Sequence, residues 1–445
     1  MPGVLLPALI PQFHMRTTSR LKSAFRRSSR LGTGRAYLLA QAHPEVDFSA
    51  AIIEAATRNF AYEGQSESNR AAYAYGLYCL VRQQARIRRA VLKALAREQD
   101  DTWTLTHLFA LTLKFAQAGD AQARRALYRR FLMRPINGAR WAGADEIITL
   151  DGQAGFNYIV RKVGRRLARR PNDWEDAMHI NTLQEKYPAV DAWFELRQLA
   201  TRNEDARRYL RNVEATLASR TEHARPAEVP DADLADILRL RGRYAMRWQL
   251  RKRGLEPHEI QQLAEQLLTE PDPLVRENLY SVFTLFPFPL SFEPILAQAR
   301  QKPNRQNQRL ICYALDALTL VRAPEIRAFA LERLRRSSQP GRYAEILASN
   351  YQAGDAVLLT AIAERTHSEN GIEELAISYT GIYEANKTPE CAAPLLALYA
   401  KMTCGIHRKA VVELLIASNV LPAWLNEELP FDSYAGTREL HQSQP

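Results

Sequence analysis

Two cysteines and a histidine in the last quarter of the chain are the residues whose types best suit a metal ion. Cys391, Cys404 and His407 follow one another as C-x12-C-x2-H. Thiolate and imidazole are ligands that zinc prefers, but a structural zinc site takes four ligands, and no fourth candidate stands nearby. We therefore predict no metal site, with the two thiols buried and the histidine exposed.

Basic side chains recur at helical spacing in two segments of the first half. In the first segment they step by four, three, four and four residues, which places all of them on one helical face. In the second segment they stand opposite an apolar face. The two stripes are Arg82, Arg86, Arg89, Lys93 and Arg97, and Lys162, Arg165, Arg166, Arg169 and Arg170. We predict that these stripes are the contact zones for a partner that is acidic.

A third basic segment carries aromatic residues. Tyr244 and Trp248 stand at helical spacing beside Arg243 and Arg247. Such a combination can bind single-stranded nucleic acid, because bases stack on the rings while the cations hold phosphates. Aromatic residues at this spacing belong more commonly to a core, and we favour the core interpretation.

The motifs of several reaction classes are missing from the sequence. It holds no Walker A phosphate loop, no HExxH pair and no GxSxG nucleophile elbow. Gly32-Thr33-Gly34 has no preceding strand and is too short for a dinucleotide loop. We therefore expect no bound cofactor, and binding is favoured over catalysis.

The charge and the cysteine content limit the partners and the location that the chain can be expected to have. The net charge is +11, which favours an acidic partner such as nucleic acid, an acidic protein or an anionic membrane, although genomic base bias would enrich arginine equally. No apolar run reaches the roughly 18 residues that span a bilayer. Four scattered cysteines without a CxxC pair are typical of a reducing compartment, so a cytoplasmic location is expected.

The elements that position these residues are expected to be helices throughout. The pattern is clearest in residues 309–336, where two apolar stripes of helical period are separated by Pro324, a residue suited to a first helical turn. Neither stripe can be buried alone, so we predict that such helix pairs stack on one another. Five pairs are expected to begin near residues 259, 291, 324, 354 and 388.

Composition also divides the chain. Residues 1–44 hold no acidic residue and are expected to form a basic, disordered leader, with a phosphate-binding arm or a transit peptide as alternatives. Residues 45–218 are expected to form an N-terminal helical repeat region. A proline-containing linker or seam follows at 219–232, then a second helical region at 233–429 and a polar tail at 430–445.

The Asp-Pro-x-Val-Arg opening at residues 272–276 resembles the second helix of a HEAT repeat. The stretches YEGQSESNR, LDGQAGF and CGIHRKAVVELL resemble bacterial HEAT-repeat proteins, an uncharacterised, armadillo-like group. This resemblance implies an all-α fold, an α-α superhelix built as a solenoid of helix pairs. It also implies a non-enzymatic scaffold or interaction module that binds a protein or peptide on its concave face.

Some HEAT-like proteins are alkylpurine DNA glycosylases, and this resemblance supplies the alternative, a nucleic-acid-binding function. Those enzymes set an aspartate and aromatic residues against a cationic face, and here Trp141 stands four residues before Asp145. The carboxylate would stabilise positive charge developing on the sugar. A packing role for Trp141 and a helix-capping role for Asp145 explain the same spacing, so no catalytic residue is predicted.

Overall fold

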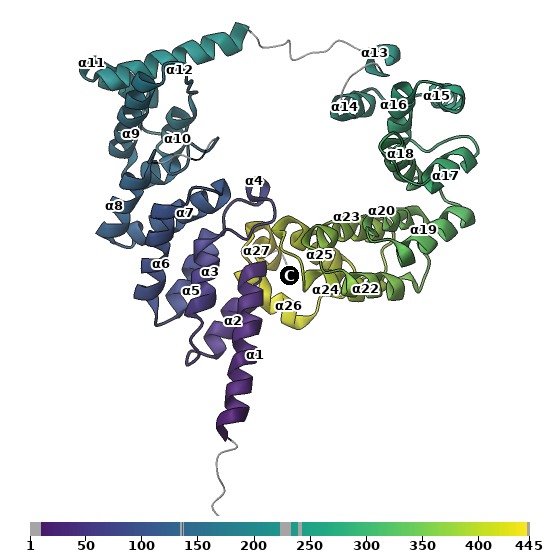
Figure 1. Cartoon of the computed structure of the whole chain (residues 1–445), viewed down its shortest axis with the longest axis horizontal. Helices are drawn as coiled ribbons and strands as arrows, with labels where there is room; N and C mark the ends of the chain where they lie inside the picture. Colours follow the sequence, from purple (N-terminus) through teal and green to yellow (C-terminus); the bar gives the residue numbers. More distant parts are fainter. Residues whose placement is uncertain (1–9, 134–135, 137, 223–232, 239–242, 443–445) are drawn as a thin grey trace, which may run out of the picture. The chain divides into compact units, whose positions relative to one another are not determined.

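The computed structural model describes residues 10–133, 136, 138–222, 233–238 and 243–442. Within these ranges the chain forms helices joined by turns and contains no strand (Figure 1). The all-α prediction is therefore confirmed. The finer prediction, a HEAT-like superhelix, stays a prediction.

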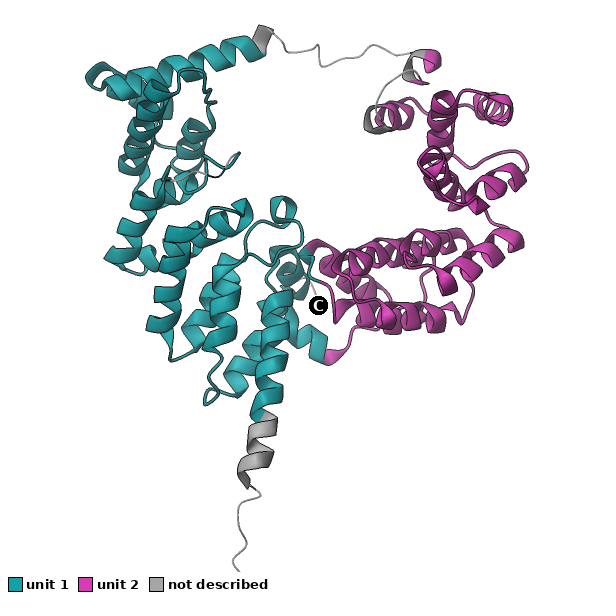
Figure 2. Cartoon of the chain, in the orientation of Figure 1, with its two compact units in different colours: residues 1–227, 403–405, 424–445 teal, residues 228–402, 406–423 magenta. Residues whose placement is uncertain are grey.

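The chain divides into two compact units (Figure 2). Unit 1 comprises residues 1–227, 403–405 and 424–445, and unit 2 comprises residues 228–402 and 406–423. The change of unit at residue 227 falls within the predicted seam, of which residues 223–232 lie outside the described part of the chain.

Unit 1 is built mainly from the first twelve helices. They are α1 (Ile10–Leu31), α2 (Arg35–Ala42), α3 (Ser49–Thr57), α4 (Gly64–Glu67), α5 (Ala71–Leu80), α6 (Gln84–Arg97), α7 (Thr102–Gln117), α8 (Ala121–Arg130), α9 (Ala144–Arg169), α10 (Met178–Lys186), α11 (Ala192–Arg202) and α12 (Glu204–Glu222). Three short elements from the end of the sequence join them: α26 (Ala423–Glu428), η2 (Leu429–Phe431) and α27 (Ala435–Gln442).

Residues 1–9 of the predicted disordered leader lie outside the described residues, and the rest of it is instead largely helical, because α1 and α2 lie in it. Phe25 is fully buried, and its ring stacks on Phe48 with centroids 4.2 Å apart. Arg26 forms an ion pair with Glu54 at 2.6 Å. The Arg/Ser-rich composition favours disorder, but the stacked rings of Phe25 and Phe48 and the ion pair of Arg26 with Glu54 hold α1 against the α3 region.

The predicted polar tail is also structured and belongs to unit 1. The ring of Phe431 stacks on Tyr37 with centroids 5.3 Å apart, and the backbone N–H of Ser433 donates to the carbonyl of Gly32 at 2.8 Å. Glycine is required at position 34, because a Cβ atom there would lie 1.9 Å from the carbonyl oxygen of Glu428.

The core of unit 1 follows the apolar stripes of its helices. In α9 the predicted apolar face is buried; it consists of Phe156, Ile159, Val160, Val163 and Leu167. Burial of this face turns the basic face of the same helix outward. Helices α9 and α12 approach closely at Gly164, where a Cβ atom would lie 1.9 Å from the carbonyl oxygen of Asp205.

Unit 2 contains the remaining helices. They are α13 (Leu234–Leu238), α14 (Arg243–Arg253), α15 (Pro257–Thr269), α16 (Pro273–Phe283), α17 (Glu293–Arg300), α18 (Gln308–Leu318), α19 (Pro324–Arg336), α20 (Gly341–Ala344), α21 (Leu347–Asn350), α22 (Asp355–Arg365), α23 (Glu369–Ala385), η1 (Pro389–Cys391), α24 (Ala392–Tyr399) and α25 (Gly405–Ala417). Helices begin at Pro257, Glu293, Pro324, Asp355 and Ala392, close to the expected starts.

The helix pair read from residues 309–336 is present as α18 and α19. Leu310, Ala314 and Leu318 of the first helix are buried, as are Ile326 and Leu334 of the second. Proline occupies the first turn of α19, as predicted. Helix α16 begins in the same manner, and the side chain of its N-cap, Asp272, accepts a hydrogen bond from the N–H of Leu274 at 2.8 Å.

Candidate anion-binding site

Six cationic side chains line one cleft of unit 1, with a cavity volume of about 390 Å³. We call it the α9 cleft. Five of its residues are those of the predicted second stripe: Lys162, Arg165, Arg166, Arg169 and Arg170. Arg140, from the loop before α9, completes the set of cations, and the single apolar residue of the lining is Leu132.

Three carboxylates hold half of these cations in place. Asp173 lies 2.8 Å from Nη1 of Arg140 and 3.4 Å from Nε of Arg166. The guanidinium of Arg166 also donates to Glu175. Nε of Arg165 donates to Asp205 at 2.9 Å. Six cations less three carboxylates leave a formal charge of +3 around the cleft.

The environment of these ion pairs is partly dehydrated. Burial raises the pKa of Glu175 above its usual range, while the positive charge of Arg166 acts in the opposite direction. Arg166 itself is largely buried. Because charges interact more strongly where water is excluded, this arginine is held firmly in one orientation.

The other three cations are available for a ligand. Within the described part of the chain, Lys162, Arg169 and Arg170 make no ion pair. The Nζ atom of Lys162 lies 5.8 Å from the ring centroid of Tyr158. Arg169 and Arg170 are exposed at the end of α9. The cleft thus combines oriented arginines with cations that have no carboxylate of their own.

The first predicted stripe lies elsewhere on unit 1. All five of its residues are exposed, but Arg82 precedes the start of α6 at Gln84 and so is not on the predicted helical face; the four on α6 are Arg86, Arg89, Lys93 and Arg97. Arg86 donates to Ser49 at 3.1 Å, and none of the five lines the α9 cleft. The cleft therefore brings together the second stripe but not the first.

A second cavity of unit 1, of about 280 Å³, lies between α6 and α8. Its lining includes Arg125 and Arg129, together with apolar residues of α6. Arg130 also lines it but has a structural role: it is buried and donates to the carbonyls of Leu95 at 2.9 Å and Glu98 at 2.6 Å. Those carbonyls lie at the end of α6, where helical acceptors lack partners.

The third basic segment differs from its prediction. Trp248 was expected in the core but is exposed, with Nζ of Lys252 5.7 Å from its ring centroid. The periodic spacing was read as a buried face, whereas the buried residues among the described side chains of this helix are Met246 and Leu250. Arg247 is half-buried. The side chains of Arg243 and Tyr244 lie outside the described residues.

Trp141 and Asp145 are not joined in a catalytic arrangement. Asp145 is exposed and pairs with Lys186 at 3.2 Å, while the indole N–H of Trp141 donates to the carbonyl of Gly138 at 3.2 Å. Neither residue lines either of the two cavities described above. Gly143, with φ of 92°, occupies the N-cap of α9, so Asp145 lies in the first turn and is not the cap.

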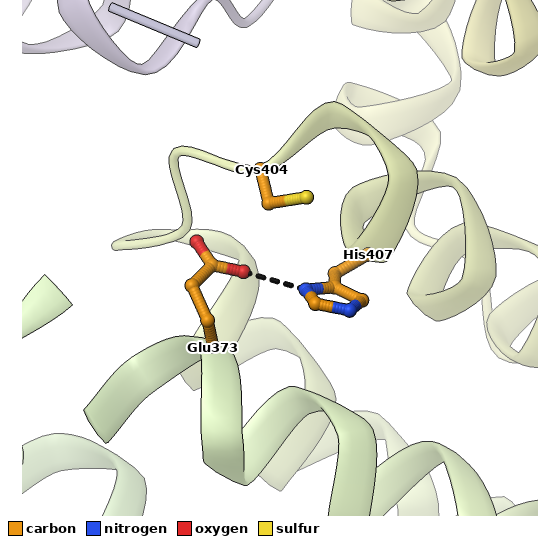
Figure 3. Close-up of side chains that lie close together, drawn as sticks. All are labelled: Glu373, Cys404 and His407. Carbon is orange, nitrogen blue, oxygen red and sulfur yellow. Dashed lines mark hydrogen bonds and ion pairs between the residues drawn. The ribbon is translucent and has the colours of Figure 1, made fainter. Parts of the chain in front are cut away.

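The possible metal ligands lie near α23 and α25 (Figure 3). Nδ1 of His407 is 2.8 Å from a carboxylate oxygen of Glu373, whose side chain is buried. Cys404 precedes His407 by three residues, and one ligand atom from each of the three residues lies within 4.8 Å of the others. Cys391, the partner suggested by the sequence spacing, is not in this group. Both thiols are buried as predicted, and His407 is half-buried where exposure was predicted.

This group is better explained by the hydrogen bond between His407 and Glu373 than as a metal centre. Three ligands are one fewer than a structural zinc site uses. A histidine that pairs with a buried carboxylate compensates the carboxylate's loss of hydration. The sequence offered no sign of Glu373, because it lies on a separate helix and the C-x12-C-x2-H spacing directed attention to Cys391. The prediction that the chain has no metal site stays a prediction.

Comparisons of the sequence with protein-family models, with curated proteins and with solved structures find no match. The resemblance to HEAT-repeat proteins therefore stays a prediction. Among the described residues, no helix combines the length and apolar character needed to cross a bilayer.

Proposed function

We propose that this chain is a non-enzymatic interaction protein that binds an acidic partner through the α9 cleft. The observation that carries the proposal is the lining itself, in which six of seven residues are cationic. Such a concentration of like charge is unfavourable unless counterions or a ligand neutralise it. An anionic partner would supply that neutralisation.

The residue types suit oxyanions. Five of the six cations are arginines, and a guanidinium can donate two parallel hydrogen bonds to a phosphate or carboxylate. Asp173 and Glu175 hold Arg166 in place before any ligand arrives. Prior orientation lowers the entropy lost when a ligand binds.

The same lining supports binding over catalysis. It contains no histidine, carboxylate, thiol or hydroxyl group that could act as a general base or nucleophile. A solenoid of helix pairs remains the architectural part of the proposal, and a protein or peptide on its concave face is the partner that the HEAT-repeat resemblance implies, whereas the cleft itself supports only that the partner is acidic. The exposed, ion-paired Asp145 supports no glycosylase activity.

Binding of inorganic polyphosphate to the intact chain tests the proposal, because this probe carries charge and no other recognition feature. We expect binding that weakens at least tenfold in an Arg169→Glu/Arg170→Glu variant. The matched control is Arg305→Glu/Arg335→Glu, which makes the same charge change at exposed positions of unit 2. Equal loss in both variants, or no binding by the intact chain, contradicts a specific role for the cleft.

A further inference from the structure

Trp174 is an exposed tryptophan in the loop whose acidic residues hold arginines of the α9 cleft. Its exposed fraction is 62%, the largest among the described tryptophans. The residues on either side of it, Asp173 and Glu175, are the ones whose carboxylates bind arginines of the cleft. An indole left in water forgoes the favourable burial of a large apolar surface, so its exposure in this loop calls for a reason.

The loop that carries Trp174 is fixed by a side chain of α12. The amide oxygen of Asn212 accepts the backbone N–H of Glu175 at 2.8 Å, and its amide nitrogen donates to the carbonyl of Asp173 at 3.1 Å. One asparagine thus holds the backbone on both sides of the tryptophan. The exposed ring is therefore presented from a clamped loop.

The indole is also supported by a cation. The guanidinium carbon of Arg220 lies 5.5 Å from the ring centroid, and Arg220 pairs with Asp176 at 3.6 Å. A ring backed by an arginine and otherwise open to solvent is a suitable platform for stacking.

We infer that the α9 cleft and the indole of Trp174 form one two-part site for single-stranded nucleic acid, with phosphates in the cleft and a base stacked on the ring. This inference rests on the proposed function and adds the class of partner. An acidic peptide would use the cations but would have no need of the ring. Bases of a duplex are already stacked on one another, so an exposed ring favours a single strand.

Fluorescence anisotropy of a labelled oligothymidylate tests the inference with the full chain. Trp174→Ala should weaken oligothymidylate binding about tenfold, as expected for loss of one stacked base, and leave polyphosphate binding unchanged. Trp174→Phe should recover part of the loss because it keeps a ring. Trp248→Ala, which removes an exposed tryptophan of unit 2, is the matched control and should have no effect.

The outcomes separate the two proposals. If polyphosphate binds but Trp174→Ala leaves oligothymidylate affinity unchanged, the two-part site is wrong and the cleft remains an acidic-partner site. If polyglutamate binds as tightly as oligothymidylate and loses as much affinity in Trp174→Ala, the nucleic-acid assignment is wrong. If no anion binds, the proposed function fails together with the inference.

Discussion

The guanidinium of Arg140 lies 2.8 Å from the carboxylate of Asp173, which links the loop before α9 to the loop after it. The same carboxylate lies 3.4 Å from Arg166. One acidic side chain thus controls the spacing of two cleft arginines and lowers the charge that a ligand meets.

Replacing that carboxylate should strengthen anion binding. Asp173→Asn keeps the side-chain shape and the loop's backbone hydrogen bonds while adding one net positive charge to the cleft. We expect polyphosphate to bind several-fold more tightly at low salt, because one more unit charge near the cleft contributes about 1 kcal/mol in water. Calorimetric titration of the variant and the intact chain with polyphosphate would measure this change in affinity. Weaker binding would mean that holding Arg140 and Arg166 in place matters more than net charge.

Affinity for oligothymidylate should fall steeply with salt. Three cations of the cleft, Lys162, Arg169 and Arg170, are available to neutralise phosphates, and each contact on a single strand contributes about −0.7 to the slope of log K against log salt. The expected slope is about −2 for the intact chain and shallower by about 0.7 for Lys162→Ala. A slope near zero would contradict phosphate contacts in the cleft.

Acid should destabilise unit 1 through His107. This side chain is fully buried, and burial lowers the pKa of His107 to about 4 from an ordinary value of 6.5. Above pH 6.5 the ring is neutral in both the folded and the unfolded chain, so His107 does not lower the free energy of unfolding there. As the pH falls from 6.5 towards 4, only the unfolded chain takes up the proton, and unit 1 loses about 3 kcal/mol.

Thermal unfolding between pH 7 and pH 4.5 measures this effect. His107→Leu should flatten the acid-dependent decrease in melting temperature, whereas His258→Leu, at an exposed position, should leave it intact. An unchanged pH dependence in His107→Leu would assign the acid sensitivity to other groups. His179, whose pKa burial also lowers to about 4, would be the next to test.

Glu428 should have the opposite pH dependence. It is buried in unit 1, and burial raises its pKa to about 7, although the charge of Arg35 acts against the shift. Below pH 4.5 the carboxyl group is protonated in both the folded and the unfolded chain, so Glu428 does not lower the free energy of unfolding there. As the pH rises towards 7, the Glu428 carboxyl group ionises in the unfolded chain first, which lowers the free energy of unfolding by up to about 3 kcal/mol. Glu428→Gln should therefore raise the melting temperature at pH 8 and change little at pH 4.5.

Arg130 should matter for stability although it lines a cavity. Its guanidinium satisfies carbonyls at the end of α6, so Arg130→Met leaves buried acceptors without donors. We expect a loss of about 3 kcal/mol in the free energy of unfolding. Arg129→Met, at the exposed neighbouring position, is the control and should cost less than about 0.5 kcal/mol.

Local pattern was sufficient to predict the helices but not the site. The pair at residues 309–336 and the buried face of α9 follow from a repeat of three and four residues, which depends only on neighbours along one helix. The second arginine stripe was predicted for the same reason. Arg140, Asp173 and Asn212 escaped prediction, because loop folding and helix packing bring them to the cleft. Cys391 was chosen over Glu373 for the same lack of information on contacts between helices.

The placement of residues 424–442 in unit 1 affects the order in which the protein can fold. Ser433 must reach Gly32 across nearly the whole sequence, and closing a loop of that length carries an entropic penalty of about 5 kcal/mol if the intervening chain is unfolded. During synthesis, the surface around Gly34 and Tyr37 stays uncovered until Glu428 and Phe431 have left the ribosome. Unit 1 is therefore completed only after unit 2 has been synthesised, and a ribosome stalled within unit 2 would leave a nascent chain whose first helices lack their cover.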